Sequence, residues 1–268
     1  LEPFRKFKRE SIMPIKQSVC LPILPPMDRG ELLREIAAIG YPAIEVWGRD
    51  DDFSALCAEA AGHGLKVVSM IGHGSLPDGL NKPENHDRIE VELRESIDFA
   101  AEYGVGGLIC FSGNRVEGME EEEAIENTVD GFLRVSSYAE EKGINLNIEL
   151  LNSKVDHAGY QCDFTDWGFE VVARVGSPRV KLLYDIYHMQ IMEGDVIRTI
   201  TEHSAAFGHF HTAGNPGRND LDDQQELNYA AICAAIAATD YEGYVGHEFK
   251  PKGEVVPALR QAFELCDV

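Results

Sequence analysis

Residues 180–212 read VKLLYDIYHMQIMEGDVIRTITEHSAAFGHFHT, with two short apolar runs on either side of a longer amphipathic stretch. The runs Val180–Asp185 and Phe207–Thr212 have the length and the apolar and aromatic content of buried strands. The stretch between them is long enough for a helix that carries the chain from one parallel strand to the next. The segment therefore predicts one strand–helix–strand unit.

The same alternation extends along the chain from Lys16 onward. One helix is predicted at residues 31–39, before Gly40, and another from about 121 to 142, closed by Gly143. Besides the two strands above, the predicted strands cover residues 17–21, 43–47, 66–71, 107–111, 145–150 and 243–249. Eight strands separated by helices indicate a parallel sheet with its helices outside.

Such a sheet is either open and doubly wound or closed into a barrel. An open sheet normally carries a Gly-rich phosphate turn after its first strand, and here that position reads Leu21-Pro-Ile-Leu-Pro-Pro-Met27. We therefore predict an α/β fold, a single (β/α)8 TIM barrel over residues 13–268, after a poorly ordered N-terminal extension at residues 1–12. The longest predicted loops, residues 72–84 and 213–227, follow strand ends on the side where barrel enzymes build their sites.

The composition excludes several classes of partner. A net charge of −22 disfavours binding to the phosphate backbone of nucleic acids. No apolar run approaches the roughly 20 residues that a membrane span requires. The six cysteines are spread along the chain without a CxxC pair, which indicates reduced, mostly buried thiols and a reducing compartment, the cytoplasm.

Four side chains that can bind a metal stand at the ends of four successive predicted strands: Glu149, Asp185, His211 and Glu248. In a closed barrel the ends of adjacent strands lie roughly 5 Å apart, so these groups can converge on one point. Each residue taken singly is more simply a core polar group or a surface acid. Three carboxylates buried together would repel one another without a cation, so we predict one divalent cation, Mg²⁺ or Mn²⁺, with Co²⁺ or Zn²⁺ as further candidates and no organic cofactor.

Four motifs in this part of the chain resemble the hydroxypyruvate isomerase family. They are Tyr184-Asp-Ile-Tyr-His-Met-Gln190, His211-Thr-Ala-Gly-Asn-Pro-Gly-Arg218, Glu226-Leu-Asn-Tyr229 and Gly246-His-Glu-Phe-Lys-Pro251. That family belongs to the wider sugar isomerase/epimerase barrels (xylose isomerase-like, endonuclease IV-like), which include D-tagatose 3-epimerase, inosose dehydratase and endonuclease IV. The resemblance runs from about Met13 to the C-terminus, and it is the order and spacing of the motifs that make it specific.

The resemblance implies roles for the four strand-end residues. Glu149 and Glu248 match the paired glutamates that bind the metal and exchange substrate protons, and Asp185 matches the third ligand. His211 stands where hydroxypyruvate isomerases often have Gln and the epimerases have His, so the fourth ligand is similar to that of an epimerase.

The resemblance also implies substrate contacts. His188 matches a histidine that contacts a substrate oxygen near the metal, and Arg218 matches a substrate-binding arginine. The epimerases carry a further substrate-facing Glu six residues after the first catalytic one, and here that place is Val155. This departure weakens the expectation of a ketohexose substrate.

For several other residues the sequence allows two alternative roles. Trp47 and His73 end the second and third predicted strands, where they could form a pocket wall and a polar contact with substrate. Lys250 shares a face with Glu248 and either meets a substrate carboxylate or neutralises the excess acid. Glu45 forms either an ion pair inside the barrel or part of the site, and the loop that holds His157 either closes over the substrate or, more simply, is solvated.

Together these features predict a divalent-metal-dependent isomerase of the aldose–ketose type, which moves a proton between adjacent carbons through an enediolate. Hydroxypyruvate and tartronate semialdehyde are the expected pair. A ketose 3-epimerase and an inosose dehydratase-like lyase remain alternatives on the same barrel. A DNA-repair nuclease would need more strand-end histidines and a basic groove, and a noncatalytic barrel would not need the full ligand set. The expected partner is a small hydroxy-carbonyl or sugar substrate, with no nucleic acid and no membrane, and a homodimer or homotetramer is the expected assembly.

Overall fold

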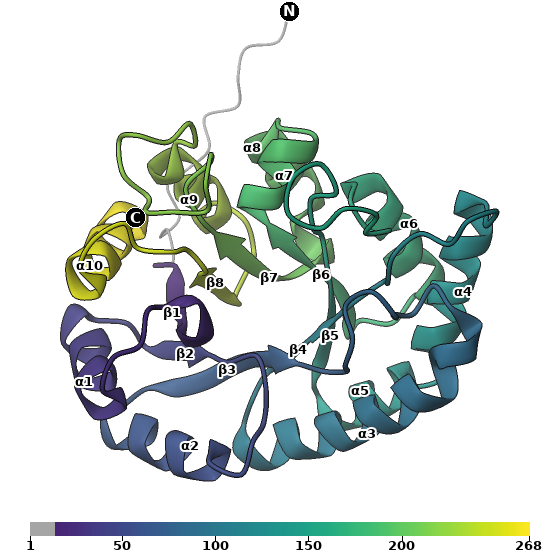
Figure 1. Cartoon of the computed structure of the whole chain (residues 1–268), viewed down its shortest axis with the longest axis horizontal. Coiled ribbons are helices and arrows are strands. Elements are labelled where there is room, and N and C mark those ends of the chain that lie inside the picture. The colour runs from purple at the N-terminus through teal and green to yellow at the C-terminus, as the bar shows by residue number, and fades with distance from the viewer. Residues whose placement is uncertain (1–13) are drawn as a thin grey trace, which may run out of the picture.

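The structure, a computed structural model, describes residues 14–268 and contains a closed barrel of eight parallel strands (Figure 1). The predicted N-terminal extension, residues 1–12, and Met13 lie outside the described residues. Each strand pairs with the next along the chain, and β8 returns to β1, where Tyr244 is the partner of Lys16. The strands are β1 Lys16–Cys20, β2 Ala43–Glu45, β3 Lys66–Ile71, β4 Gly107–Cys110, β5 Asn145–Glu149, β6 Val180–Asp185, β7 Phe207–Thr212 and β8 Tyr244–His247. The predicted (β/α)8 barrel is confirmed.

The helices form a ring outside the barrel (Figure 1). Side chains at some helix starts satisfy free backbone N–H groups: Asp28 caps α1 by accepting from the N–H of Glu31 at 2.9 Å. The α-helices are α1 Arg29–Ile39, α2 Phe53–Gly62, α3 His86–Tyr103, α4 Glu121–Leu133, α5 Ser136–Lys142, α6 Thr165–Val175, α7 Ile186–Met192, α8 Val196–His203, α9 Tyr229–Ala237 and α10 Val255–Cys266. Short 3₁₀ turns cover Leu21–Ile23, Pro83–Asn85 and Ser204–Ala206.

The prediction of one helix over residues 121–142 is wrong, because α4 and α5 are separated at Arg134 and Val135. The carbonyl oxygen of Arg134 accepts a hydrogen bond from the guanidinium of Arg94 on α3 at 3.0 Å. That bond comes from a neighbouring helix and replaces the intrahelical bond that a continuous helix would make. By contrast, α1 ends at Ile39 as predicted, where Gly40 has a φ of 121°.

The barrel interior carries a polar layer below the mouth. Glu45, Asn147 and His209 are all buried there, on β2, β5 and β7. Gly246 of β8 leaves space for this layer, since a Cβ atom at that position would lie 2.0 Å from Oε1 of Glu45. The apolar core, in contrast, packs between the strands and the helices, and includes Leu33 and Phe132.

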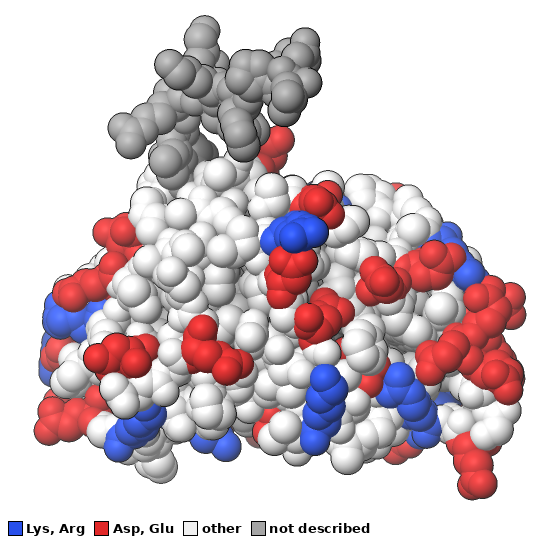
Figure 2. Space-filling model, turned by 90° about the horizontal axis from the view of Figure 1, so that it is seen from above, with Lys and Arg blue, Asp and Glu red and all other residues white. Residues whose placement is uncertain are grey.

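The surface agrees with the charge of the chain. Asp and Glu side chains are spread over the face shown in Figure 2, with fewer Lys and Arg between them. No helix within residues 14–268 is both long and apolar enough to cross a membrane. All six cysteines are free thiols, and all but Cys57 are buried, as predicted.

Candidate metal centre and active site

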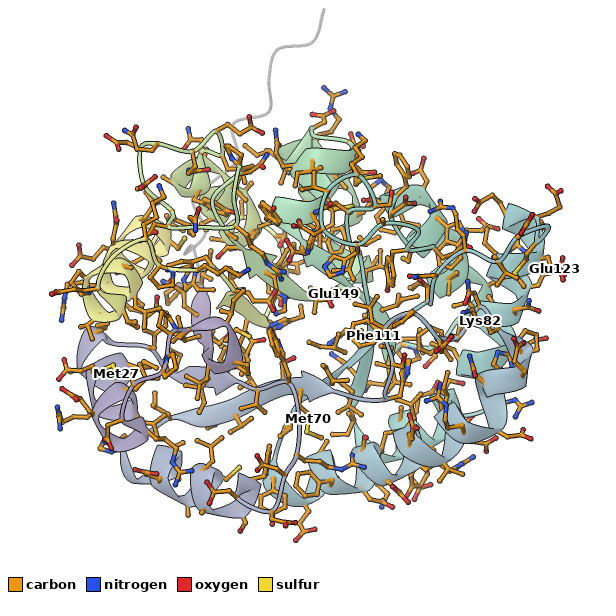
Figure 3. All side chains as sticks on the ribbon, in the orientation of Figure 1. Met27, Met70, Lys82, Phe111, Glu123 and Glu149 are labelled. Atoms are coloured by element: carbon orange, nitrogen blue, oxygen red, sulfur yellow. The ribbon has the colours of Figure 1, made fainter. Side chains whose placement is uncertain are left out.

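The four predicted ligands converge at the mouth of the barrel. Glu149 ends β5, Asp185 ends β6, His211 lies at the end of β7, and Glu248 follows β8. One potential ligand atom from each lies within 4.8 Å of those of the others, and all four residues are buried. Nδ1 of His211 lies 3.4 Å from Glu149 Oε1, 4.0 Å from Asp185 Oδ2 and 3.3 Å from Glu248 Oε2. Figure 3 shows Glu149 near the barrel centre.

The cluster fits a single divalent cation. Oxygen and nitrogen ligands at about 2.1 Å from a Mg²⁺-sized ion lie roughly 3 to 4 Å from one another, which is the spacing found here. Nδ1 of His211 is buried and has no hydrogen-bond partner among the described residues. A buried nitrogen without a partner, aimed at three carboxylates, is what a metal ligand requires. Three oxygen donors and one imidazole suit Mg²⁺ or Mn²⁺.

The electrostatics of the cluster also favour an added positive charge. Burial raises the pKa of Glu149 and that of Asp185. Burial acts in the same direction on Glu248, but the charges of His211 and Arg218 outweigh it and hold the Glu248 pKa below its ordinary value. Burial lowers the pKa of His211, yet Glu248 and Glu45 together raise it well above the ordinary value. The cluster therefore attracts protons, and a divalent cation would displace them.

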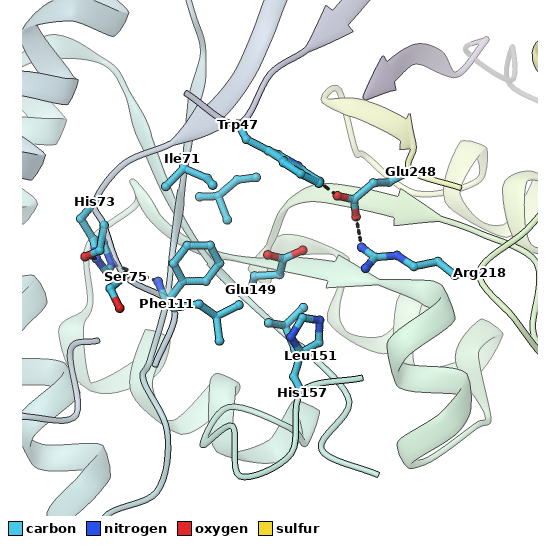
Figure 4. Close-up of a pocket in the computed structure, with 13 residues that line it drawn as sticks. Trp47, Ile71, His73, Ser75, Phe111, Glu149, Leu151, His157, Arg218 and Glu248 are labelled. Carbon is cyan, nitrogen blue, oxygen red and sulfur yellow. Dashed lines mark hydrogen bonds and ion pairs between the residues drawn. The ribbon is translucent and has the colours of Figure 1, made fainter. Parts of the chain in front are cut away.

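Glu248 is held in place by three groups. Trp47 donates its indole N–H to Oε1 of Glu248 at 3.2 Å, and the Arg218 guanidinium donates to Oε2 (Figure 4). The thiol of Cys20 lies 3.7 Å from the same Oε1. Trp47, which the sequence placed in the pocket wall, is there, and it also orients this carboxylate.

The pocket at the barrel mouth has a volume of about 320 Å³ and two chemically different sides (Figure 4). Its polar lining includes Glu149, Glu248, Arg218 and His157, whereas Asp185 and His211 lie below the lining. Its apolar wall consists of Ile71, Leu76, Ile109, Phe111 and Leu151. Of the four candidate ligands, only the two glutamates reach the space that a substrate would occupy.

His188 is oriented by the loop that follows β5. The side-chain amide of Asn152 lies 2.5 Å from Nδ1 of His188, and Asn152 Oδ1 accepts from the backbone N–H groups of Val155 and Asp156. The amide NH₂ therefore donates to Nδ1, and Nε2 carries the imidazole hydrogen. That Nε2 is buried without a partner, 3.7 Å from Oδ2 of Asp185. Burial and Arg218 lower the pKa of His188 well below its ordinary value, so it is a neutral donor beside the cluster.

Two residues predicted to contact the substrate differ in their placement: His73 lines the pocket with both ring nitrogens hydrogen-bonded, and Lys250 lies outside the lining. Nε2 of His73 accepts the N–H of Phe111 at 3.0 Å, and its Nδ1 lies 3.1 Å from the carbonyl oxygen of Gly74. Burial lowers the His73 pKa to about 4, so the ring is neutral and both its nitrogens are used. Lys250 is exposed and does not line the pocket; its backbone N–H donates to the carbonyl of Arg218 at 2.8 Å.

The sequence does not single out His157 as a pocket residue, because its loop is more simply interpreted as solvated. Its ring lines the pocket, its Nε2 is buried without a partner, and it packs against His188 with 5.2 Å between ring centroids. Val155 instead has 68% of its surface exposed. An Asn that is followed by a tight turn is the one local sign that this loop folds back onto the barrel.

Comparison with known proteins finds relatives that share this barrel fold. The family described as the xylose isomerase-like TIM barrel matches residues 33–266. The hydroxypyruvate isomerase of Escherichia coli is 31% identical over 64% of this chain and 67% of its own length. The 2-oxo-tetronate isomerase of Haemophilus influenzae is 30% identical over 88% of this chain and 92% of its own. A solved family 2 AP endonuclease from Brucella melitensis superposes with a TM-score of 0.79 and 25% identity, over 96% of this chain and all of that one.

Proposed function

The chain belongs to the xylose isomerase-like TIM-barrel family and is an isomerase, and we propose that it acts with one divalent cation on a small 2-oxo acid that carries a hydroxyl group on the next carbon. Hydroxypyruvate is the first candidate, and 2-oxo-tetronate is its four-carbon homologue. The observation that carries the proposal is the buried cluster of three carboxylates around the unpartnered Nδ1 of His211. Glu149, Asp185, His211 and Glu248 would hold the cation.

The reaction moves a hydrogen between two neighbouring carbons. When bound, the cation would polarise the carbonyl group and stabilise the negative charge of the enediolate. Glu149 takes the proton from the hydroxyl-bearing carbon and afterwards releases it to solvent, while Glu248, an ionised carboxylate that first takes up a proton from solvent, delivers that proton to the former carbonyl carbon. The hydroxyl hydrogen passes to the former carbonyl oxygen, so atoms and electrons balance without an outside oxidant.

The assignment of Glu149 as the base has a geometric reason. Its side chain contacts His211 but accepts no hydrogen bond from an arginine or tryptophan in the described part of the chain. Glu248, in contrast, is anchored by Trp47 and Arg218. A carboxylate with a raised pKa and few donors is the better proton acceptor.

Arg218 and His188 would bind the substrate oxygens. Nε of Arg218 is buried without a partner, so the guanidinium still has a hydrogen to offer a substrate carboxylate. Nε2 of His188 points to the region of Asp185, where it can donate to an oxygen of the reacting carbons.

Deuterium exchange tests this proposal directly. Purified protein with Mg²⁺ in D₂O is incubated with hydroxypyruvate, 2-oxo-tetronate or a ketohexose and followed by ¹H NMR. We expect deuterium to enter one carbon of the 2-oxo acids while the isomeric aldehyde or ketone appears. Protein that binds metal yet exchanges no hydrogen in either acid would overturn the assignment.

A ketose 3-epimerase is the second candidate, because His211 occupies the fourth ligand position as in the epimerases that the motifs resemble. Exposed Val155 opposes it, since that place offers no carboxylate to a longer sugar. Exchange at C3 of the ketohexose, without exchange in the acids, would favour this function. A nuclease is not proposed, because the chain carries a charge of −22.

A further inference from the structure

A second buried cluster lies directly beneath the candidate metal ligands. Glu45 of β2 reaches across the barrel interior, and its Oε2 lies 3.0 Å from Nε2 of His211. Its Oε1 lies 3.0 Å from Nε2 of His209 and accepts a hydrogen bond from the Ser18 hydroxyl at 2.5 Å. All four residues are at most 4% exposed. His211 therefore belongs to both clusters, one through each ring nitrogen.

The contact with Glu45 determines which nitrogen of His211 is free. An ionised carboxylate only accepts hydrogen bonds, so Nε2 of His211 must carry the hydrogen. When a cation takes the place of the second ring proton, Nδ1 offers it the lone pair, and it is this atom that faces Glu149, Asp185 and Glu248. Ligating histidines commonly donate their second N–H to a carboxylate in this way, which fixes the ring and strengthens the ligand.

The surrounding sequence is adapted to Glu45. A buried carboxylate is unfavourable without partners, and here two imidazoles and one hydroxyl supply them. Burial would raise the Glu45 pKa, but His209 and His211 lower it well below the ordinary value. Gly246 gives the carboxylate its space, because a Cβ there would approach Oε1 to 2.0 Å.

We propose that Glu45 is a positioning residue for the metal centre: it holds His211 in the Nε2-protonated tautomer and presents Nδ1 to the cation. The proposal rests on the proposed function, because it requires that His211 is a metal ligand. Glu45 does not line the pocket and so does not touch the substrate. His209 has a different role: it hydrogen-bonds Oε1, the other carboxylate oxygen of Glu45.

The test uses variants that separate the acceptor from the packing. Glu45→Met keeps a similar shape but removes the acceptor, and Glu45→Gln keeps one oxygen that can accept from His211. His209→Gln is the matched control, because it changes the same cluster and leaves the Glu45–His211 contact in place. Each full-length protein is titrated with Mn²⁺ by calorimetry, and its metal-free melting temperature is recorded.

We expect Glu45→Met to lose about 10- to 100-fold in Mn²⁺ affinity, the range found when such supporting groups are removed. Glu45→Gln should recover most of that loss, and His209→Gln should stay within roughly threefold of the unaltered protein. If Glu45 serves only to hold the core together, the variants will differ in melting temperature while Mn²⁺ affinity remains unchanged, which overturns the proposal.

A spectroscopic measurement keeps the test valid even if Glu45→Met fails to fold. In the Mg²⁺-loaded unaltered protein, long-range ¹H–¹⁵N spectra should show His211, assigned with His211→Gln, protonated at Nε2 only. A hydrogen on Nδ1 in that state contradicts the proposal. Failure of the proposed function is distinguishable, because a protein that isomerises nothing can still show the Glu45-dependent Mn²⁺ affinity and the Nε2 hydrogen.

Discussion

The two sides of the pocket differ in what their side chains can still bind. On the side of β5 to β8, His211, His188 and Arg218 each have a buried nitrogen without a partner. On the side of β3 and β4 the wall is apolar, and its one histidine, His73, has partners for both nitrogens. His73, near the end of β3, is therefore fully hydrogen-bonded within the protein, whereas His211, near the end of β7, keeps a nitrogen free to bind a cation. The chemistry is concentrated where hydrogen-bonding capacity is left unused.

The pKa shifts of His73 and His211 show the same difference between the two sides. Burial lowers the His73 pKa to about 4, because no charge opposes it strongly enough. Burial also lowers the pKa of His211, but neighbouring carboxylates reverse the effect and raise it well above its ordinary value. A strand-end histidine is therefore a candidate metal ligand only when acidic groups surround it.

Removal of the cation should have the largest effect on activity. Its direct effect should be limited to the side of β5 to β8, where the four candidate ligands lie. Dialysis against a chelator is expected to abolish isomerisation, and added Mn²⁺ should restore it. At a concentration 100 times its dissociation constant, the cation should also stabilise the fold by about 2.7 kcal/mol. Turnover and urea unfolding, measured with and without Mn²⁺, check this. Full activity in protein shown to be metal-free would remove the metal from the mechanism.

Loss of either glutamate in the pocket should come next. Glu149→Gln and Glu248→Gln keep the shape but remove the proton-transfer group, so we expect kcat to fall at least about 10³-fold. Steady-state rates on hydroxypyruvate at saturating Mn²⁺ measure this. The matched control is Glu264→Gln, an exposed position on α10, which should leave the rate unchanged. Near-normal turnover in either pocket variant would rule out the paired-glutamate mechanism.

The neutral histidine of the apolar side predicts a pH dependence of stability. Between pH 6.5 and about 4 the unfolded chain binds a proton at His73 and the folded chain does not, so stability falls as the pH is lowered through this window. A shift of this size corresponds to a loss of about 3 kcal/mol in the free energy of unfolding. Urea unfolding at several pH values should give a shallower curve for His73→Asn than for the unaltered protein. Parallel curves would mean that His73 titrates normally.

A change in the apolar wall should have the smallest effect. Phe111→Leu keeps the wall apolar but alters its shape, so we expect a rise in KM of up to about tenfold, or about 1.4 kcal/mol. Mn²⁺ affinity should not change, because the Phe111 side chain has no group that binds a metal. Parallel calorimetry and kinetics separate the two quantities. A loss of Mn²⁺ affinity in this variant would show that the two sides of the pocket are coupled.

Most of the barrel could be predicted because its signals are local. The bounds of β3, β6 and β7 agree with the predicted strands, and β8 is shorter at both ends than the predicted run. Strand order then follows from the alternation of strands and helices, since a parallel barrel places each strand beside the next. The convergence of Glu149, Asp185, His211 and Glu248 follows from the same rule, because their positions at strand ends are set by sequence alone.

What could not be predicted depends on contacts between distant residues. The break before α5 involves Arg94 of another helix, and the neutral state of His73 depends on its burial in the folded barrel. His157 lines the pocket because its loop turns back, while Lys250, beyond the end of β8, is exposed and does not line it. Periodicity contains no information on which hydrogen bonds a side chain finally makes.

The sequence by itself therefore determined the barrel, its eight strands and the four residues that meet at its mouth, since all of these follow from residue type and spacing along the chain. Only the tertiary structure decided which polar groups remain free to act. Glu45 illustrates the division: it is one acid in a buried strand by sequence, and it contacts His211 because closing the barrel brings β2 and β7 face to face across the interior.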